Sequence, residues 1–118
     1  TFAGNPLGAA AGLATLDVIE DENLVANAEA RGEQLRDGIM ATGNPLFVSV
    51  RGRGLLDAVE LKHPCSHAVM NYCLEHGLIV NAVAPNALRF APPLIVTAQD
   101  VDQALAILKD VPTDLPDD

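Results

Sequence analysis

Capping and turn-forming residues divide this chain into separate helices and strands. Asn5 and Pro6 are typical of a helix start, because the asparagine side chain accepts from an unpaired backbone amide and proline has no amide to satisfy. Thr97 and Asp100 have the spacing of a capping box, and residues 43–45 (Gly-Asn-Pro) predict a turn. The chain is therefore expected to form several separate helices and strands.

The apolar pattern between these breaks predicts four helices and four strands. Periods near 3.6 residues predict helices at 7–20, 24–39, 68–76 and after Thr97, and apolar runs predict strands at 46–50, 55–61, 78–83 and 87–91. The turns within the two strand pairs are expected at 51–54 and 84–86. This order predicts an α+β fold, in which a long N-terminal helix precedes a small antiparallel sheet of three to four strands, covered by helices mainly on one face.

Length and charge limit the organisation and the partners of the chain. Its 118 residues, 49% of them apolar, can bury one core, which is expected over residues 1–111. Residues 112–118 are rich in Asp and Pro and are predicted to form a frayed, solvated acidic tail. The net charge of −9 argues against nucleic-acid binding, since a phosphate backbone requires many cationic contacts.

No segment of the sequence resembles a signal peptide or a membrane span. The longest apolar stretch is interrupted well before the roughly 20 residues that a membrane helix requires. Cys65 and Cys73 are the only cysteines and fit reduced thiols in a cytoplasmic protein, with Cys73 in the core. The chain opens at Thr1 without leading residues, which is expected of an excised piece of a longer protein.

Three motifs could be read as binding sites, but their patterns indicate structural roles. His63 and His67 have the spacing of two metal ligands on one helical face, but a third ligand is missing, so a surface or capping role is favoured and no metal is expected. His76 is expected at the end of a helix, just before Gly77. The RGRG run at 51–54 lacks the pattern of a phosphate-binding loop.

Arg89 is the residue that most suggests a ligand. It stands in the middle of the apolar run ALRFAPPL, where a buried guanidinium would require a carboxylate or phosphate partner. The alternative is an arginine on the solvent face of an edge strand. The residues alone leave both interpretations open.

Three segments in order resemble the class III pyridoxal-phosphate-dependent aminotransferases and, within them, the acetylornithine aminotransferases. TFAGNPLGAAAGLATLDVI at 1–19 resembles the family's T-F-G-G-N-P-L segment, and RGRGLLDAVEL at 51–61 resembles its R-G-x-G-L strand pair. GLIVNAVAPNALRFAPPLIVT at 77–97 resembles its G-L-hydrophobic-V-N and L-R-hydrophobic-x-P-P-L element. The resemblance implies the C-terminal small domain of a fold-type I transferase.

The same resemblance implies two ligand contacts within this chain and a catalytic residue outside it. Arg89 would bind the substrate's α-carboxylate, and Thr1 would reach the phosphate of the pyridoxal phosphate held in the other subunit of a homodimer. The substrates implied are N-acetylornithine and glutamate or 2-oxoglutarate, in arginine biosynthesis. The family's catalytic lysine lies in a preceding large domain, so this chain alone is expected to be inactive. Lys62 and Lys109 are expected to be solvated.

Two positions depart from the family pattern, and two other functions stay open. Ala3 and Ala58 stand where the family has Gly, and neither is expected to touch the proposed contacts. Ornithine, succinylornithine or 4-aminobutyrate could be the amino donor instead, or the chain could be a non-enzymatic module that binds a small anion. In the chain alone, leucines of the first helix such as Leu7, Leu13 and Leu16 are expected to be exposed.

Overall fold

The computed structural model describes all 118 residues as four helices and a four-stranded sheet. In chain order the elements are α1 (Pro6–Asp21), α2 (Leu24–Ala41), β1 (Phe47–Arg53), β2 (Leu56–Leu61), α3 (Ser66–Glu75), β3 (Asn81–Ala84), β4 (Ala87–Phe90) and α4 (Ala98–Lys109). This is the predicted order, and the α+β class is confirmed. Both predicted caps form, because Asn5 accepts from the amide of Gly8 and Thr97 makes a reciprocal capping box with Asp100.

The first hairpin differs from the prediction in the position of its turn. The predicted turn at 51–54 is wrong, because residues 51–53 belong to β1 and pair with residues 56–58 of β2. Gly54 has a φ of 57°, a left-handed conformation that glycine adopts without strain, so the reversal needs only Gly54 and Leu55. Arginine and glycine are weak strand formers, and here pairing with β2 overrides their propensity. At the second hairpin, residues 78–80 lie outside the strand that was predicted to include them.

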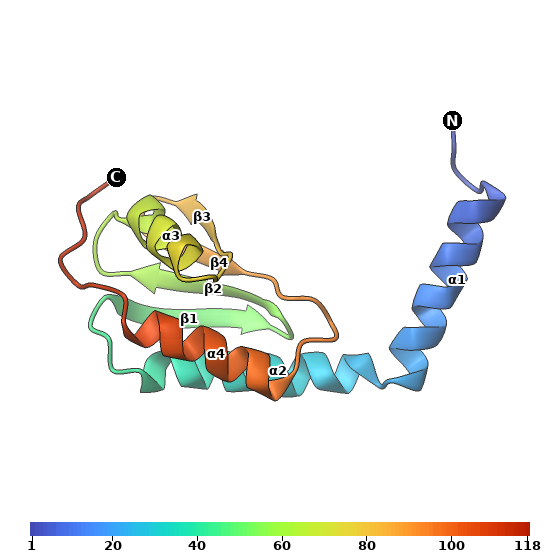
Figure 1. Ribbon diagram of the computed structural model, residues 1–118, viewed down its shortest axis with the longest axis horizontal. Helices are drawn as coiled ribbons and strands as arrows, with labels where there is room; N and C mark the ends of the chain where they lie inside the picture. The colour runs from blue at the N-terminus through green and yellow to red at the C-terminus, as the bar shows by residue number, and fades with distance from the viewer.

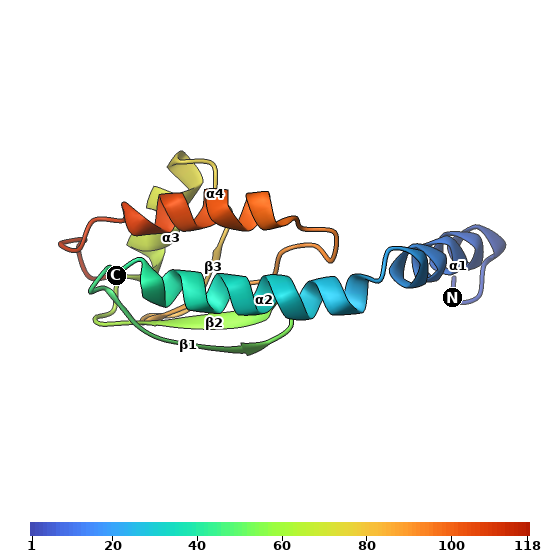
Figure 2. The same cartoon turned by 90° about the horizontal axis from the view of Figure 1, so that it is seen from below.

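The sheet is antiparallel throughout, in the order β1-β2-β4-β3, so that β4 is an interior strand. Burial alternates along the strands: Val59 and Leu88 are buried on one face, whereas Ala58 and Arg89 point to the other. Helices α2, α3 and α4 all lie on the buried face (Figures 1 and 2). The opposite face of the sheet is open.

The core fills the space between the sheet and its three helices. Fully buried side chains from every layer meet there, including Ile39, Val59, Leu88 and Leu108. Cys73 is also buried, as predicted, and burial raises the pKa of its thiol to about 11, so the thiol stays protonated at neutral pH.

A close junction fixes the first hairpin to α2. A Cβ built on Gly32 would lie 1.7 Å from the carbonyl oxygen of Gly54, so only glycine permits this approach of helix and turn. Beside it, Arg36 Nη1 donates to Asp57 Oδ1 at 2.8 Å and to Gly54 O at 3.0 Å. The side chain of Asp57 is fully buried, and burial raises its pKa although Arg36 opposes the shift.

The acidic C-terminus is not frayed, contrary to the prediction. The Asp118 carboxylate accepts from the amides of His67 and Ala68 and from the Ser66 hydroxyl, and so caps the first turn of α3. Burial raises the pKa of Asp118, but these hydrogen bonds together outweigh it and lower the pKa to about 2. The ring Nδ1 of His67 also lies 3.0 Å from Oδ2 of Asp118, and the ring Nδ1 of His63 lies 2.7 Å from Oδ1 of Asp117. Both histidines thus have the surface and capping roles that were favoured.

Helix α1 projects away from the rest of the chain (Figures 1 and 2). None of its residues is buried, and Leu7, Leu13 and Leu16 are 83%, 63% and 57% exposed, as expected for the chain alone. No helix in the structure has the length and apolar character needed to span a bilayer.

Candidate functional site

One row of residues crosses the open face of the sheet through all four strands. The pairing register places Ala58 of β2 opposite Arg51 on one side and opposite Arg89 on the other, and Asn81 of β3 opposite Arg89. Residues paired in register point to the same face. The row therefore consists of Arg51, Ala58, Arg89 and Asn81. One arginine lies on each side of Ala58, which has the smallest side chain of the four.

Arg89 has no acidic partner within the chain. The three ion pairs of the structure involve Arg36, His63 and His67. Arg89 is exposed, and its Nη2 donates one hydrogen bond, 3.3 Å long, to Oδ1 of Asn81. The alternative of an arginine on the solvent face of an edge strand is confirmed for the solvent face and wrong for the edge, since β4 lies between β2 and β3. Arg89 is thus an unneutralised cation in the middle of a sheet.

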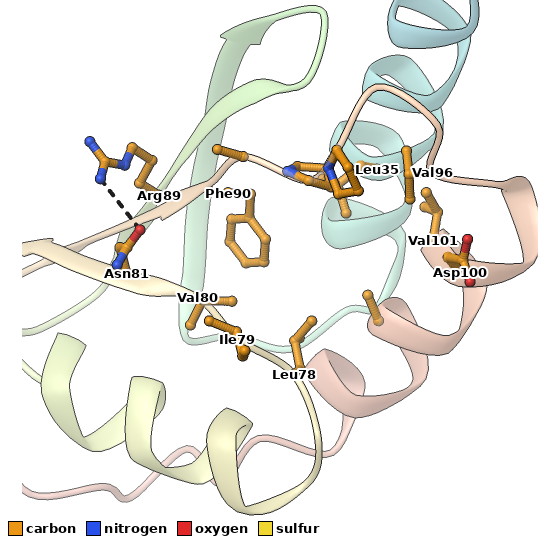
Figure 3. A pocket seen from close by; sticks show the side chains of 14 residues that line it. Leu35, Leu78, Ile79, Val80, Asn81, Arg89, Phe90, Val96, Asp100 and Val101 are labelled. Carbon is orange, nitrogen blue, oxygen red and sulfur yellow. Dashed lines mark hydrogen bonds between the residues drawn. The ribbon is translucent and has the colours of Figure 1, made fainter. Parts of the chain in front are cut away.

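An apolar cavity of about 380 Å³ lies beside this row, at the ends of β3 and β4. Nine of its fourteen lining residues are hydrophobic, among them Val80 just before β3, Phe90 of β4 and Val101 of α4. Figure 3 shows Arg89 and Asn81 together, directed away from the ring of Phe90. Arg89 lines both this cavity and the pocket on the open face, and Asn81 also lines the cavity.

A second, shallower pocket of about 450 Å³ lies on the open face itself. Both Arg51 and Arg89 line it, and Ala58 lies between them. Asp57 also lines this pocket, but its side chain is buried and paired with Arg36. Ala58 was not expected to touch the proposed contacts, but the register places Ala58 of β2 directly opposite Arg89 of β4.

The remaining candidates lie apart from this row. Thr1 is exposed at the far end of α1 (Figure 1). Lys62 and Lys109 are exposed, as expected, and neither lines a described pocket. No three His, Cys, Asp or Glu residues are grouped to hold a metal ion.

Sequence reasoning missed Arg51 and Asn81 as neighbours of Arg89. The turn predicted at 51–54 would place Arg51 outside the sheet, so it gave no reason to expect a strand partner for Arg51. Asn81 could have been found, because the hairpin turn predicted at 84–86 places residues near 81 and 89 opposite one another. The link between β2 and β4 had no signal in the sequence, since α3 and β3 separate those strands along the chain.

Comparison with known proteins gives one consistent result. The sequence pattern of the family "Aminotransferase class-III" matches residues 1–111. The chain is 44% identical to the acetylornithine aminotransferase of Gloeobacter violaceus over 119 aligned residues, covering 98% of this chain and 30% of the relative. It is 36% identical to the ornithine aminotransferase of Emericella nidulans, covering 98% of this chain and 27% of that protein.

Solved structures agree with this comparison. The acetylornithine aminotransferase of Elizabethkingia anophelis superposes with a TM-score of 0.82 at 37% identity, covering 92% of this chain and 30% of that one. An S-selective transaminase from Arthrobacter sp. superposes with a TM-score of 0.84 at 27% identity, covering 92% of this chain and 29% of that one. The chain thus spans about a third or less of the proteins that it matches.

Proposed function

Because the chain belongs to the class III aminotransferase family, we propose that it is the C-terminal small domain of an enzyme that transfers an amino group between N-acetylornithine and 2-oxoglutarate, in arginine biosynthesis. One observation carries the proposal: Arg89 is an unpaired guanidinium on the open face of the sheet. Its natural partner would be a substrate carboxylate. The 44% identity to an acetylornithine aminotransferase supports the choice of donor.

In this proposal Arg89 binds the α-carboxylate and orients the substrate. A guanidinium is a planar fork that can donate two parallel hydrogen bonds to one carboxylate, which an ammonium group cannot do. Asn81 accepts from Nη2 and so restrains the fork, while further N–H groups of Arg89 remain free for the ligand. Fixing the carboxylate holds the α-carbon in one place, which makes the following proton transfer effectively intramolecular. Arg89 itself does not react.

The cofactor of the proposed enzyme is pyridoxal phosphate, which when bound supplies an electron sink for charge at the α-carbon. Within this chain only Thr1 is a candidate contact, through a hydroxyl that can donate to a phosphate oxygen. The lysine and the other cofactor contacts are assigned to segments outside the chain. The isolated chain is accordingly proposed to be inactive.

The distance between Thr1 and Arg89 favours a homodimer. Helix α1 has 16 residues, so it is about 24 Å long, and it points away from the sheet (Figure 1). Thr1 and Arg89 of one chain therefore cannot contact one small ligand. If both residues serve the same kind of site, Thr1 must serve the site of a second subunit.

Replacing Arg89 with glutamine in the full-length protein tests the proposal. The variant is expected to lower kcat/KM for N-acetylornithine by more than about tenfold, because a hydrogen bond to a charged group contributes roughly 1.5 to 3 kcal/mol. Arg53→Gln is the matched control: Arg53 lies at the end of β1, is exposed and lies outside the pocket that Arg89 lines. Equal kinetics for Arg89→Gln and the native enzyme would remove Arg89 from the site.

Asn81→Asp provides a second test of the same geometry. An aspartate opposite Arg89 would form an internal ion pair and compete with the substrate for the guanidinium. KM for N-acetylornithine should rise by about tenfold, measured by steady-state kinetics, whereas Asn81→Ser, which keeps an acceptor without a charge, should change it far less. An unchanged KM for the aspartate variant would show that Asn81 does not face the bound carboxylate.

Ornithine is the second candidate donor, because ornithine aminotransferases are also among the relatives, at 36% and 42% identity. Comparing kcat/KM for ornithine, N-acetylornithine, succinylornithine and 4-aminobutyrate in the full-length protein separates these donors.

If the chain were instead a non-enzymatic anion-binding module, the isolated chain would bind one of these compounds or glutamate at micromolar affinity. Isothermal titration of that chain would detect such binding.

A further inference from the structure

Helix α3 has no capping side chain of its own at its start. Its N-cap residue, Cys65, is fully buried, and its side chain makes no capping hydrogen bond. The first amides of a helix have no partner within the helix, so they need an acceptor from elsewhere. The Asp118 carboxylate is that acceptor, 51 residues away in sequence, and it lies 3.0 Å from the amide of His67 and 3.3 Å from that of Ala68. Figure 1 shows the C-terminus beside α3.

Ser66, the first residue of α3, joins this cap to the β3–β4 hairpin. Its hydroxyl donates to Oδ2 of Asp118 at 3.0 Å, and its amide donates to the carbonyl oxygen of Pro85 at 3.0 Å. Pro85 is one of the two residues in the turn between β3 and β4. Because Ser66 is fully buried, water cannot replace either partner. The Asp118 carboxylate and the hairpin turn are therefore connected through a single residue.

The position of this turn decides which residue lies opposite Arg89. Strand β3 is an edge strand of four residues, and its pairing with β4 is already irregular between Ala82 and Ala84. The turn of a hairpin sets its register, and a slip by one residue moves every side chain of the strand to the other face. A slip in β3 would thus remove Asn81, whose Oδ1 accepts from Nη2 of Arg89 at 3.3 Å.

We infer that Asp118 is a positioning residue for substrate binding. By capping α3 it holds Ser66 against the β3–β4 turn, and the fixed turn keeps Asn81 opposite Arg89. The inference rests on the proposed function for the role of Arg89, although Asp118 lines neither pocket that Arg89 lines. Asp118 also lies beyond residues 1–111, which the family pattern matches, so this contact is a feature of the present chain.

Substitution of Asp118 in the full-length protein tests the inference by kinetics. Asp118→Ala is expected to raise KM for N-acetylornithine by about threefold or more and to change kcat by less than about twofold, because a binding-competent fraction of about a third lowers the apparent affinity in proportion. Molecules that have bound substrate hold the hairpin in place and react normally. Asp118→Asn should recover most of the loss, because an amide oxygen also caps a helix.

Asp117→Ala is the matched control, since it removes the neighbouring carboxylate and leaves the cap of α3 intact. Asp117 pairs with His63, which precedes the helix, and its side chain is 66% exposed. Its KM for N-acetylornithine should stay within about twofold of the native value, as expected for an exposed ion pair.

Hydrogen exchange in the full-length protein separates positioning from a general loss of stability. In Asp118→Ala the amides of residues 66–68 and of β3 should exchange about tenfold faster or more, because they lose the cap and the fixed turn. The amides of α4 should keep their rates, because α4 is capped by its own Thr97 and Asp100.

An unchanged KM in Asp118→Ala would overturn the inference, and so would exchange that rises equally in α4. A fall in kcat at constant KM would also overturn it, because positioning of the binding residue acts on affinity. If Arg89→Gln left the kinetics unchanged, the proposed function would fail. Faster exchange confined to residues 66–68 and β3 would in that case still show that Asp118 holds the hairpin.

Discussion

Arg36→Met is expected to lower the free energy of unfolding of the 118-residue chain by about 3 kcal/mol. The substitution leaves the carboxylate of Asp57 buried without a counter-ion, and breaking one side of a buried pair costs about 3 to 5 kcal/mol. The lower end applies because the Arg36 side chain is 24% exposed. Urea denaturation monitored by circular dichroism measures the change.

Two controls separate the lost ion pair from lost packing. Arg53→Met removes an exposed arginine of the adjoining hairpin and should stay within about 0.5 kcal/mol of the native chain. The double variant Arg36→Met with Asp57→Leu removes both charges and should recover much of the stability. A double variant no more stable than Arg36→Met would show that the carboxylate is not the source of the loss.

The loss in Arg36→Met should also depend on pH. Burial raises the folded-state pKa of Asp57 above its unfolded value, so the folded state binds a proton more readily than the unfolded state. Stability from this group is therefore greatest below the unfolded pKa, near 4, and decreases as pH rises through the folded pKa. Without Arg36 the folded pKa rises further. The difference between variant and native chain should therefore shrink as pH falls from 7 toward 4.

Gly32→Ala is the second substitution with a large expected effect, also about 3 kcal/mol of destabilisation. The added methyl would lie 1.7 Å from the Gly54 carbonyl oxygen, which is backbone and can move away only by shifting the hairpin turn. Overpacking of this kind costs about 1 to 3 kcal/mol, and a clash with backbone lies at the upper end. The hairpin that carries Arg51 should be displaced with it.

Gly12→Ala is the matched control, because Gly12 is also a helical glycine but its added Cβ would meet no atom within 4 Å. Alanine is the better helix former by roughly 1 kcal/mol, so this variant should lose no stability. Urea denaturation of both variants measures the contrast. Equal midpoints for Gly32→Ala and the native chain would mean that α2 and the turn can separate without cost.

Local signals predicted the elements of the fold, whereas the role that the resemblance implies for Arg89 stays a prediction. The caps at Asn5 and Thr97 formed where the sequence placed them, since a cap depends on residues three positions apart. The acidic end was mispredicted as frayed, because its position is fixed by a contact between Asp118 and the start of α3, about fifty residues away in sequence. Composition indicates solvation but carries no information on such a contact.

The neighbours of Arg89 depend on sheet order, which the sequence did not specify. Placing β4 beside β2 brings Ala58 next to Arg89, and the extended β1 adds Arg51 to the row. Periodicity identifies which face a side chain takes but not which strand lies next to it. The substrate-binding site was therefore predicted as Arg89 alone, whereas the structure places Arg89 in a row with Arg51, Ala58 and Asn81.

Helix α1 buries none of its residues, and this has a consequence for any measurement on the chain alone. A helix of its length is only marginally stable in water without tertiary contacts. The heat absorbed on melting the isolated chain should therefore correspond to residues 22–118, and the helical signal should rise when a bound surface covers Leu7, Leu13 and Leu16. The helical order of α1 then depends on what covers its apolar side chains.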